Sequence, residues 1–309
     1  MNEDHQAMPA TEAVRRWFPA TAEPVHVQDS DNSVYSFLTG EPARRYFLRL
    51  TNREHREHDQ IQAELHFILY LSKKSISVSR PIASSTHQLI EKISPDLFAC
   101  VFEAAPGSLV EVGSNDWNEK LFQTWGNFMA RMHRAAELYV PPGPRRFRWD
   151  EDDVIVNFRK HVPAHETSAL REFDCVFNHF SGQSPNNFGL IHGDLCRVNF
   201  HYDGTDLIAF DFDDACYHWF LYDLVCALSP AMFRPMAEQR AYRDWLVRGY
   251  QKVQSLPENW NEQFDWLLRL RSLYIFAHYL RKAGGQIDNH PKRRLLELLR
   301  ESFTHPFTW

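Results

Sequence analysis

Residues Ile191 to Asp213 read I-H-G-D-L-C-R-V-N-F-H-Y-D-G-T-D-L-I-A-F-D-F-D. Asp194 follows an apolar run and a glycine, and Asn199 comes five positions later. A second apolar run ends at Asp211. Asp203-Gly204 is a strong signal for a tight turn between two short strands. A loop closed by such a hairpin would bring the three polar side chains to one point.

The spacing D-x-x-x-x-N, followed by D-F-x, is typical of a site for phosphoryl transfer. In kinases the first aspartate accepts the proton of the attacking hydroxyl, and the asparagine and the second aspartate hold Mg²⁺ against the nucleotide phosphates. A hydroxyl of high pKa gains little from early deprotonation, so the aspartate orients it and takes the proton late. We therefore predict Asp194 as the catalytic base, and Asn199 and Asp211 as ligands of Mg²⁺.

Three blocks in this region carry a resemblance to a known family: H-G-D-L-C-R-V-N-F, A-F-D-F-D-D-A and L-Y-D-L. In this order they resemble the aminoglycoside phosphotransferase and choline kinase-like superfamily, whose bacterial members share the eukaryotic protein kinase fold. One departure is visible, because many members have His-Pro-Gly where this chain has Cys196-Arg197-Val198. The resemblance implies that His192 supports the catalytic loop by hydrogen bonding, and that Asp223 is buried and anchors that loop.

The order of predicted elements is that of a kinase N-terminal lobe. The patterns predict a helix at 11–17, strands at 25–27, 33–38 and 45–50, a helix at 55–71, and strands at 87–93 and 97–103. Beyond the break at 104–107 the chain becomes mostly helical. We therefore expect an α+β, two-lobed protein kinase-like fold. Its small N-lobe (1–103) has an antiparallel sheet and one main helix, the hinge is 104–107, and the C-lobe is 108–309.

The strand at 45–50 contains the candidate for gripping the nucleotide phosphates. Alternation places Leu48 and Leu50 on one face and Arg49 on the other. By resemblance, Arg49 stands where kinases carry the phosphate-binding lysine, and arginine can clamp a phosphate with two hydrogen bonds. Glu64 on the following helix is its expected ion-pair partner, with Glu57 as the competing candidate. A solvent-exposed Arg49 at the sheet edge is the alternative.

The remaining nucleotide contacts leave little trace in the sequence, since neither G-x-G-x-x-G nor a Walker P-loop occurs. The turn that ends in Asn32 and Ser33 can present N–H groups to phosphate, although an ordinary polar turn explains it equally. The resemblance places the adenine of ATP against the hinge strand, at the backbone of Phe102 and Ala104.

Composition restricts the partners and the compartment. The chain has 309 residues, of which 44% are hydrophobic, and a net charge of -6. This charge argues against nucleic acid as the main partner and is compatible with a cationic substrate. The five cysteines include no C-x-x-C pair, which favours a reducing compartment without a zinc site. No apolar run approaches membrane-spanning length, so we expect a cytoplasmic protein without a membrane partner.

The acceptor is less well defined. The cluster Tyr217 to Tyr222 could cage a cation by cation–π contact or pack in the core. Arg271, Tyr274 and His278 share a stripe of a predicted helix, and they either line an acceptor pocket or form a solvated face. The sequence leaves the oligomeric state open.

These observations lead to one main prediction and two alternatives. The main prediction is an ATP- and Mg²⁺-dependent phosphotransferase that moves the γ-phosphate to a hydroxyl of a small polar molecule, with amine-bearing acceptors among the candidates. One alternative is a bacterial serine/threonine protein kinase of the same fold. The other is a nucleotide-binding pseudokinase, which the altered segment Cys196-Arg197-Val198 and the missing glycine-rich loop motivate.

Overall fold

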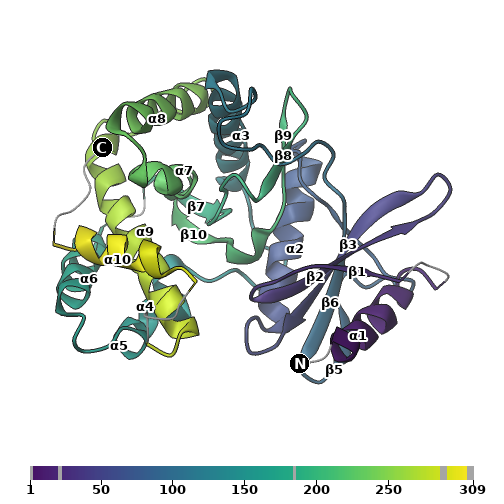
Figure 1. The fold of residues 1–309 in the computed structure, drawn as a ribbon. Coiled ribbons are helices and arrows are strands. Elements are labelled where there is room, and N and C mark those ends of the chain that lie inside the picture. Colours follow the sequence, from purple (N-terminus) through teal and green to yellow (C-terminus); the bar gives the residue numbers. More distant parts are fainter. Residues whose placement is uncertain (1–2, 20–22, 184–185, 286–290, 305–309) are drawn as a thin grey trace. The chain divides into compact units, whose positions relative to one another are not determined.

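The computed structural model describes residues 3–19, 23–183, 186–285 and 291–304 (Figure 1). The chain forms two compact units. Unit 1 contains residues 1–110, 138–146 and 198–213, and unit 2 contains residues 111–137, 147–197 and 214–309. The predicted hinge at 104–107 falls inside unit 1, and the predicted domain boundaries stay a prediction.

Unit 1 is built on an antiparallel sheet. Its strand order is β1 (Val25–Asp29), β2 (Asn32–Thr39), β3 (Arg44–Asn52), β6 (Leu97–Glu103) and β4 (Pro81–Ile82), and β5 (Glu91–Ser94) also pairs with β6. Helix α1 (Glu3–Arg15) packs on the face that carries Leu48 and Leu50. Helix α2 (His58–Lys73) contacts the opposite face through Arg49, as the predicted alternation requires.

Two N-terminal predictions were wrong in their bounds. Helix α1 begins at Glu3 rather than near residue 11 and continues through Pro9, because Ala10, Ala13 and Val14 bury a stripe against the sheet. The strand predicted at 87–93 starts only at Glu91, since His87 adopts a positive φ of 64° inside a turn closed by the hydrogen bond from its N–H to the Ser84 carbonyl.

The predicted Asp203-Gly204 hairpin is present in unit 1 as β8 (Phe200–Tyr202) and β9 (Leu207–Ala209). Asp203 shapes the turn, because its Oδ1 accepts hydrogen bonds from the N–H groups of Thr205 and Asp206. Ala209 then bonds to the segment after α2: it accepts from Ser79 at 2.9 Å and donates to Ser77 at 3.1 Å. The hairpin is therefore fixed to the body of unit 1 at the end that carries the predicted metal ligands.

Unit 2 is mostly helical, as predicted, and its helices surround a short two-stranded ladder (Figure 1). The ladder pairs β7 (Phe188–Ile191) with β10 (Cys216–Trp219) and was not predicted. The helices are α3 (Glu119–Ala136), α4 (Asp153–Val156), α5 (Phe158–His161), α6 (Thr167–Phe180), α7 (Leu221–Leu228), α8 (Met236–Tyr250), α9 (Trp260–Lys282) and α10 (Arg293–Ser302), with the 3₁₀ turns η1 (Trp149–Glu151), η2 (Phe212–Asp214, at the boundary of the units) and η3 (Ser229–Phe233).

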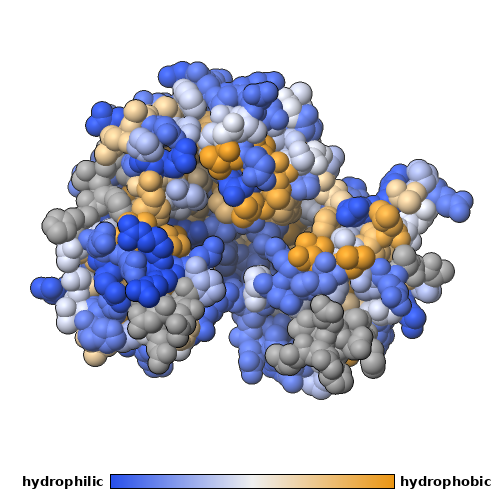
Figure 2. All heavy atoms as spheres, in the orientation of Figure 1, coloured by the Kyte–Doolittle hydropathy of each residue, from blue (hydrophilic) through white to orange (hydrophobic). Residues whose placement is uncertain are grey.

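The face of the molecule shown in Figure 2 is largely hydrophilic, and its hydrophobic side chains gather in separate patches. Isolated exposed residues such as Leu138 and Val140 are ordinary for a folded protein. Among the described residues, no helix combines the length and apolar character that crossing a membrane requires.

Two glycines allow helices α3 and α8 to cross backbone to backbone. A Cβ on Gly126 would lie 2.0 Å from the carbonyl oxygen of Leu246, and one on Gly249 would lie 2.0 Å from that of Gln123. Such distances cannot be relieved by rotating a side chain, so any larger residue forces the helices apart.

We expect Gly126→Ala to lower the free energy of unfolding by about 3 kcal/mol, because the added methyl group overpacks this crossing. Urea unfolding monitored by circular dichroism measures the change. Gly143→Ala is the matched control, since a Cβ there comes no closer than 3.9 Å to another atom. Equal midpoints for the two variants would contradict the close approach.

Candidate active site

A buried carboxylate holds the loop of unit 2 that contains Asp194, the predicted catalytic base. Asp223, in the first turn of α7, has no exposed surface. Its Oδ2 accepts from the His192 N–H at 3.1 Å and its Oδ1 from the Gly193 N–H at 2.9 Å. His133 of α3 contacts Oδ2 through Nε2 at 3.0 Å. The expectation that Asp223 anchors this loop is therefore confirmed.

The loop turns sharply at Gly193, immediately before Asp194. Gly193 has a φ of +83°, which side chains disfavour, and a Cβ there would lie 2.2 Å from the Asp214 carbonyl oxygen. The Asp194 N–H lies 3.4 Å from Nδ1 of the buried His192, in keeping with the supporting role expected for that ring. Strand β7, the glycine and the buried carboxylate together determine where Asp194 is placed.

Asp194 is paired with an arginine from a distant helix. Oδ1 of Asp194 accepts a hydrogen bond from Nη2 of Arg271, which lies in α9. The Arg271 side chain is only 11% exposed and that of Asp194 25%. The interpretation of Arg271 as part of a solvated face was therefore wrong, because α9 buries this position against the catalytic loop.

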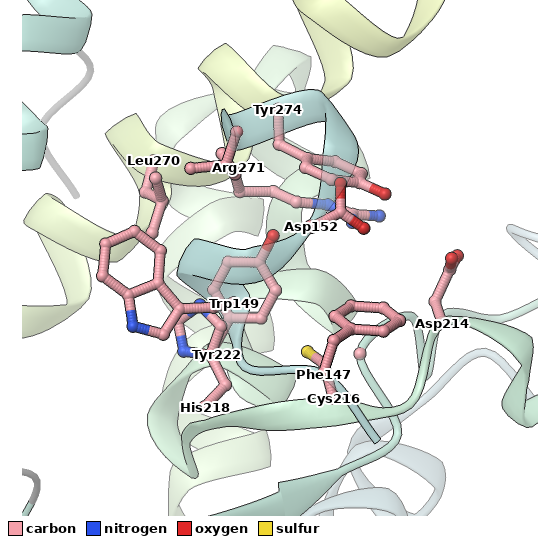
Figure 3. Close-up of a pocket in the computed structure, with 12 residues that line it drawn as sticks. Phe147, Trp149, Asp152, Asp214, Cys216, His218, Tyr222, Leu270, Arg271 and Tyr274 are labelled. Carbon is pink, nitrogen blue, oxygen red and sulfur yellow. The ribbon is translucent and has the colours of Figure 1, made fainter. Parts of the chain in front are cut away.

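A hollow that is partly open to solvent lies beside this pair within unit 2 (Figure 3). Arg271 and Gly193 contribute to its wall, together with the aromatic side chains and carboxylates that Figure 3 labels. The rings are Phe147, Trp149, Tyr222 and Tyr274, and the carboxylates are Asp152 and Asp214. Such a lining suits a ligand that carries both a flat apolar part and a positive charge.

The predicted aromatic cluster divides between the two roles that the sequence left open. His218 and Tyr222 stack with ring centroids 3.9 Å apart and line the hollow. Trp219 packs against Trp149 and neighbouring rings, and Phe220 stacks on His133 in the core. Burial lowers the pKa of His218 to about 3, so this ring is neutral near pH 7 and does not repel a cation.

Sequence reasoning missed the wall formed by Phe147, Trp149 and Asp152. The signal was the run F-R-W-D-E-D-D at 147–153, in which two rings come directly before four acidic residues. Asp152 also caps α4, since its Oδ1 accepts from the Val154 N–H at 2.8 Å. It is held in place by this local bond and is only 9% exposed.

The predicted metal ligands, Asn199 and Asp211, lie together at the open end of the β8–β9 hairpin in unit 1. The Phe210 N–H donates to the Asn199 carbonyl at 3.0 Å, which fixes the two chain segments side by side. Asp211 has a φ of 64°, a conformation that is costly for a non-glycine residue and is often found at functional sites. An amide and a carboxylate oxygen fit the preference of Mg²⁺ for hard ligands. Among the described residues, no cluster of three His, Cys, Asp or Glu side chains offers a competing metal site.

Asp213 occupies the place of the glycine in a D-F-G motif and is buried in unit 1. Its Oδ2 lies 2.5 Å from Nε2 of His55, and Arg56 approaches Oδ1 at 3.8 Å. Burial alone would raise the pKa of Asp213, but Arg56, His55 and Arg49 outweigh burial and hold that pKa well below its ordinary range. Asp213 is therefore a charged residue that ties the end of the hairpin to the start of α2.

The ion pair expected between strand β3 and helix α2 is present. Nη1 and Nη2 of Arg49 donate to Oε1 and Oε2 of Glu64 at 2.8 and 2.7 Å. Arg49 is 5% exposed and Glu64 has no exposed surface, so this is a buried, bidentate pair. The ring of Phe102 lies under the guanidinium, with its centroid 5.2 Å from Cζ. The competing candidate, Glu57, is exposed and approaches Arg53.

The other predicted nucleotide contacts also fall in unit 1. Asn32 begins β2 and its Oδ1 accepts from the Thr51 hydroxyl at 2.7 Å, while Ser33 follows it in the strand. Ala104 comes directly after β6, and its N–H donates to the Arg45 carbonyl at 3.3 Å. Phe102 has its place under Arg49. The roles of these four residues in binding a nucleotide stay predictions.

Comparison with known proteins identifies the class. Residues 22–262 match the phosphotransferase enzyme family, so the chain belongs to that family. It is an enzyme that transfers a phosphoryl group to an alcohol acceptor, as the sequence predicted. The α+β kinase-like fold is likewise confirmed.

Two amicoumacin kinases and an aminopropanol kinase are among the proteins similar to this chain. The chain is 28% identical to the amicoumacin kinase of Bacillus subtilis (strain 168), over 88% of this chain and 84% of that protein. It also resembles the solved amicoumacin kinase hAmiN in complex with AMP-PNP, Ca²⁺ and Ami, with 27% identity and a TM-score of 0.86 over 99% of this chain and 95% of that chain. A microcompartment-associated aminopropanol kinase shares the fold, with 20% identity and a TM-score of 0.73 over 96% and 94% of the two chains.

Replacing the loop anchor tests the first part of this site. Burial would raise the pKa of Asp223, but the hydrogen bond and charge of His133 outweigh it and lower the pKa below 3.8. A lowered native pKa contributes stability above the unfolded pKa, and this contribution is lost as the pH falls through the native value. We expect Asp223→Asn to lower the free energy of unfolding by about 3–5 kcal/mol at pH 7, with a difference from wild type that shrinks below pH 4.

Denaturant unfolding at pH 7 and at stepwise lower pH measures both effects. Asp174→Asn is the control, because Asp174 is a half-exposed partner of Arg159 and should change stability by less than about 0.5 kcal/mol. A difference that stayed constant down to pH 3 would show that the Asp223 charge is not what matters.

The buried pair in unit 1 gives a second prediction. Glu64→Gln leaves the Arg49 charge buried without its partner, so we expect a loss of about 3 kcal/mol in the free energy of unfolding. Glu57→Gln removes only an exposed contact and should be nearly neutral. Parallel urea titrations compare the two, and similar losses would contradict the assignment of Glu64 as the partner.

Proposed function

We propose that this enzyme is an ATP- and Mg²⁺-dependent kinase of a small, amine-bearing molecule with a hydroxyl group. The observation that carries the proposal is the position of Asp194, on an anchored loop at the edge of a hollow lined by rings and carboxylates. An aromatic wall and acidic side chains attract an organic ammonium group. The five cysteines are free, which supports a reducing compartment such as the cytoplasm.

Asp194 acts on the acceptor. It orients the acceptor hydroxyl and takes its proton as the hydroxyl oxygen forms a bond to the γ-phosphorus of ATP. The bond between that phosphorus and the β–γ bridging oxygen breaks, and its electron pair leaves with ADP. Catalysis of this step rests on positioning and on stabilising the charge of the transferring group.

Residues of unit 1 serve the nucleotide. Asn199 and Asp211 would hold Mg²⁺, which when bound neutralises the β- and γ-phosphate charge. Arg49, held by Glu64, binds the α/β-phosphates, with the turn at Asn32 and Ser33 and the backbone of Phe102 and Ala104 as further contacts. The Arg49–Glu64 pair supports this role, because the bidentate contact fixes the guanidinium in one orientation.

The proteins similar to this chain support an amine-bearing acceptor, but they do not identify the acceptor of this enzyme. The amicoumacin kinases and the aminopropanol kinase act on the compounds that their names state. The aromatic and acidic lining of the hollow supports an acceptor of this kind. We therefore propose an amino alcohol, or a larger antibiotic that contains one, as the acceptor.

The test is Mg²⁺-dependent ADP release across a panel that holds amicoumacin, 1-amino-2-propanol, spectinomycin, homoserine, glucose and a generic protein, with Asp194→Asn in parallel. We expect release with at least one amine-bearing acceptor, and a loss of about 10³-fold or more in Asp194→Asn. Phosphate transfer to the protein alone would favour a protein kinase. Binding of Mg-ATP without turnover of any acceptor would favour a pseudokinase.

A further inference from the structure

The contact between Asp194 and Arg271 assigns a role to a residue of α9. We propose that Arg271 is a positioning residue for the catalytic base. It binds Oδ1 of Asp194 and so fixes the carboxylate with Oδ2 as the oxygen that takes the acceptor proton. The proposal rests on the function proposed for Asp194 and deepens it.

The arginine is itself fixed on several sides, which a positioning residue requires. Its side chain is 11% exposed, and it also bonds to Tyr222. The ring of Tyr274 lies one helical turn further along α9, with its centroid 5.9 Å from Cζ of Arg271. A surface arginine would lose much rotamer freedom by holding a carboxylate, whereas this one is already restricted by its surroundings.

The carboxylate of Asp194 is contacted from its own loop and from α9. After Asp194-Leu195 the chain has Cys196, where many members of the family have histidine. The Cys196 thiol lies 3.8 Å from Oδ2, and a thiol is only a weak hydrogen-bond donor. Arg271 adds a charged donor to Oδ1 from outside the loop, and a charged donor holds a carboxylate more strongly than a thiol does.

The same helix offers a matched control two positions earlier. Arg269 is 20% exposed and pairs with Glu172 of α6 through two hydrogen bonds, of 2.5 and 2.9 Å. Its guanidinium covers the ring of Trp266 at 4.0 Å. Arg269→Met therefore removes a comparable, partly buried ion pair from α9, but one that does not touch the catalytic loop.

The experiment compares Arg271→Met, Arg271→Lys and Arg269→Met, each in the wild-type and in the Asp194→Asn background. ADP formation is measured with water as the acceptor and then with 1-amino-2-propanol and amicoumacin. We expect Arg271→Met to lower kcat about 100-fold, the cost of a base displaced by about 1 Å, with the KM for Mg-ATP changed less than about threefold. Arg271→Lys should recover part of the loss, because it keeps the charge without the fork.

The decisive readout is non-additivity. Once the base is absent there is nothing to position, so Arg271→Met should cost less than about threefold in the Asp194→Asn background. Arg269→Met should cost less than about threefold in both. Full, additive losses in both backgrounds, or a loss of the same size in Arg269→Met, would reduce Arg271 to a structural residue. A rise of kcat in Arg271→Met would make it an inhibitory latch, and an effect confined to the acceptor KM would make it a binding residue.

A double-mutant cycle measured by unfolding, which does not depend on turnover, serves as the control for effects on folding. Urea unfolding of Arg271→Met, Asp194→Asn and the double variant should show coupling of about tenfold in the unfolding equilibrium constant. No coupling would overturn the pair itself. A wild-type protein that forms no ADP with any acceptor overturns both this role and the proposed function, whereas wild-type turnover with additive variants overturns this role alone.

Discussion

The loop that carries Asp194 depends on the hydrogen bonds that its backbone donates to the buried carboxylate of Asp223. A loop that turns at a glycine has backbone N–H groups that no helix or sheet satisfies, and leaving them buried without acceptors is costly. Asp223 provides both oxygens to the N–H groups of His192 and Gly193 and receives His133 on the same oxygen as His192. One side chain thus joins α3, α7 and the end of β7. Asp194 inherits its position from this junction, because it is the next residue in the chain.

Each unit holds a charged residue of its predicted site in an ion pair. In unit 1 the arginine proposed to bind the phosphates is held by a buried carboxylate, since Glu64 accepts from both Nη atoms of Arg49. In unit 2 the order is reversed, and the partly buried Arg271 holds the carboxylate proposed to act on the acceptor. In each case an ion with a proposed chemical role is paired with an ion of opposite charge. The pairing keeps each charge oriented inside a poorly solvated region, where an unpaired charge would be unstable.

Prediction from sequence succeeded where the determinants are local. The Asp203-Gly204 turn gave the hairpin, and strand alternation together with the family resemblance gave the Arg49–Glu64 pair. The roles that the motif spacing assigns to Asp194, Asn199 and Asp211 stay predictions. It failed where partners are distant in sequence. Asp194 and Arg271 are 77 positions apart, and nothing in either segment marks the other. The β7–β10 ladder was not predicted for the same reason, because each strand is short and its partner lies on the other side of the loop that carries Asp194. Bounds were missed where tertiary burial extended an element, as in α1.

Helix α9 carries two partly buried ion pairs on nearly opposite sides. Successive residues advance by about 100° around a helix, so Arg269 and Arg271 project about 200° apart. One is tied to Glu172 of α6 and the other to Asp194 of the catalytic loop. A rotation of α9 about its axis would therefore break one ion pair or the other. Through α9, the orientation of the loop therefore depends in part on α6, although no described residue of α6 lines the hollow.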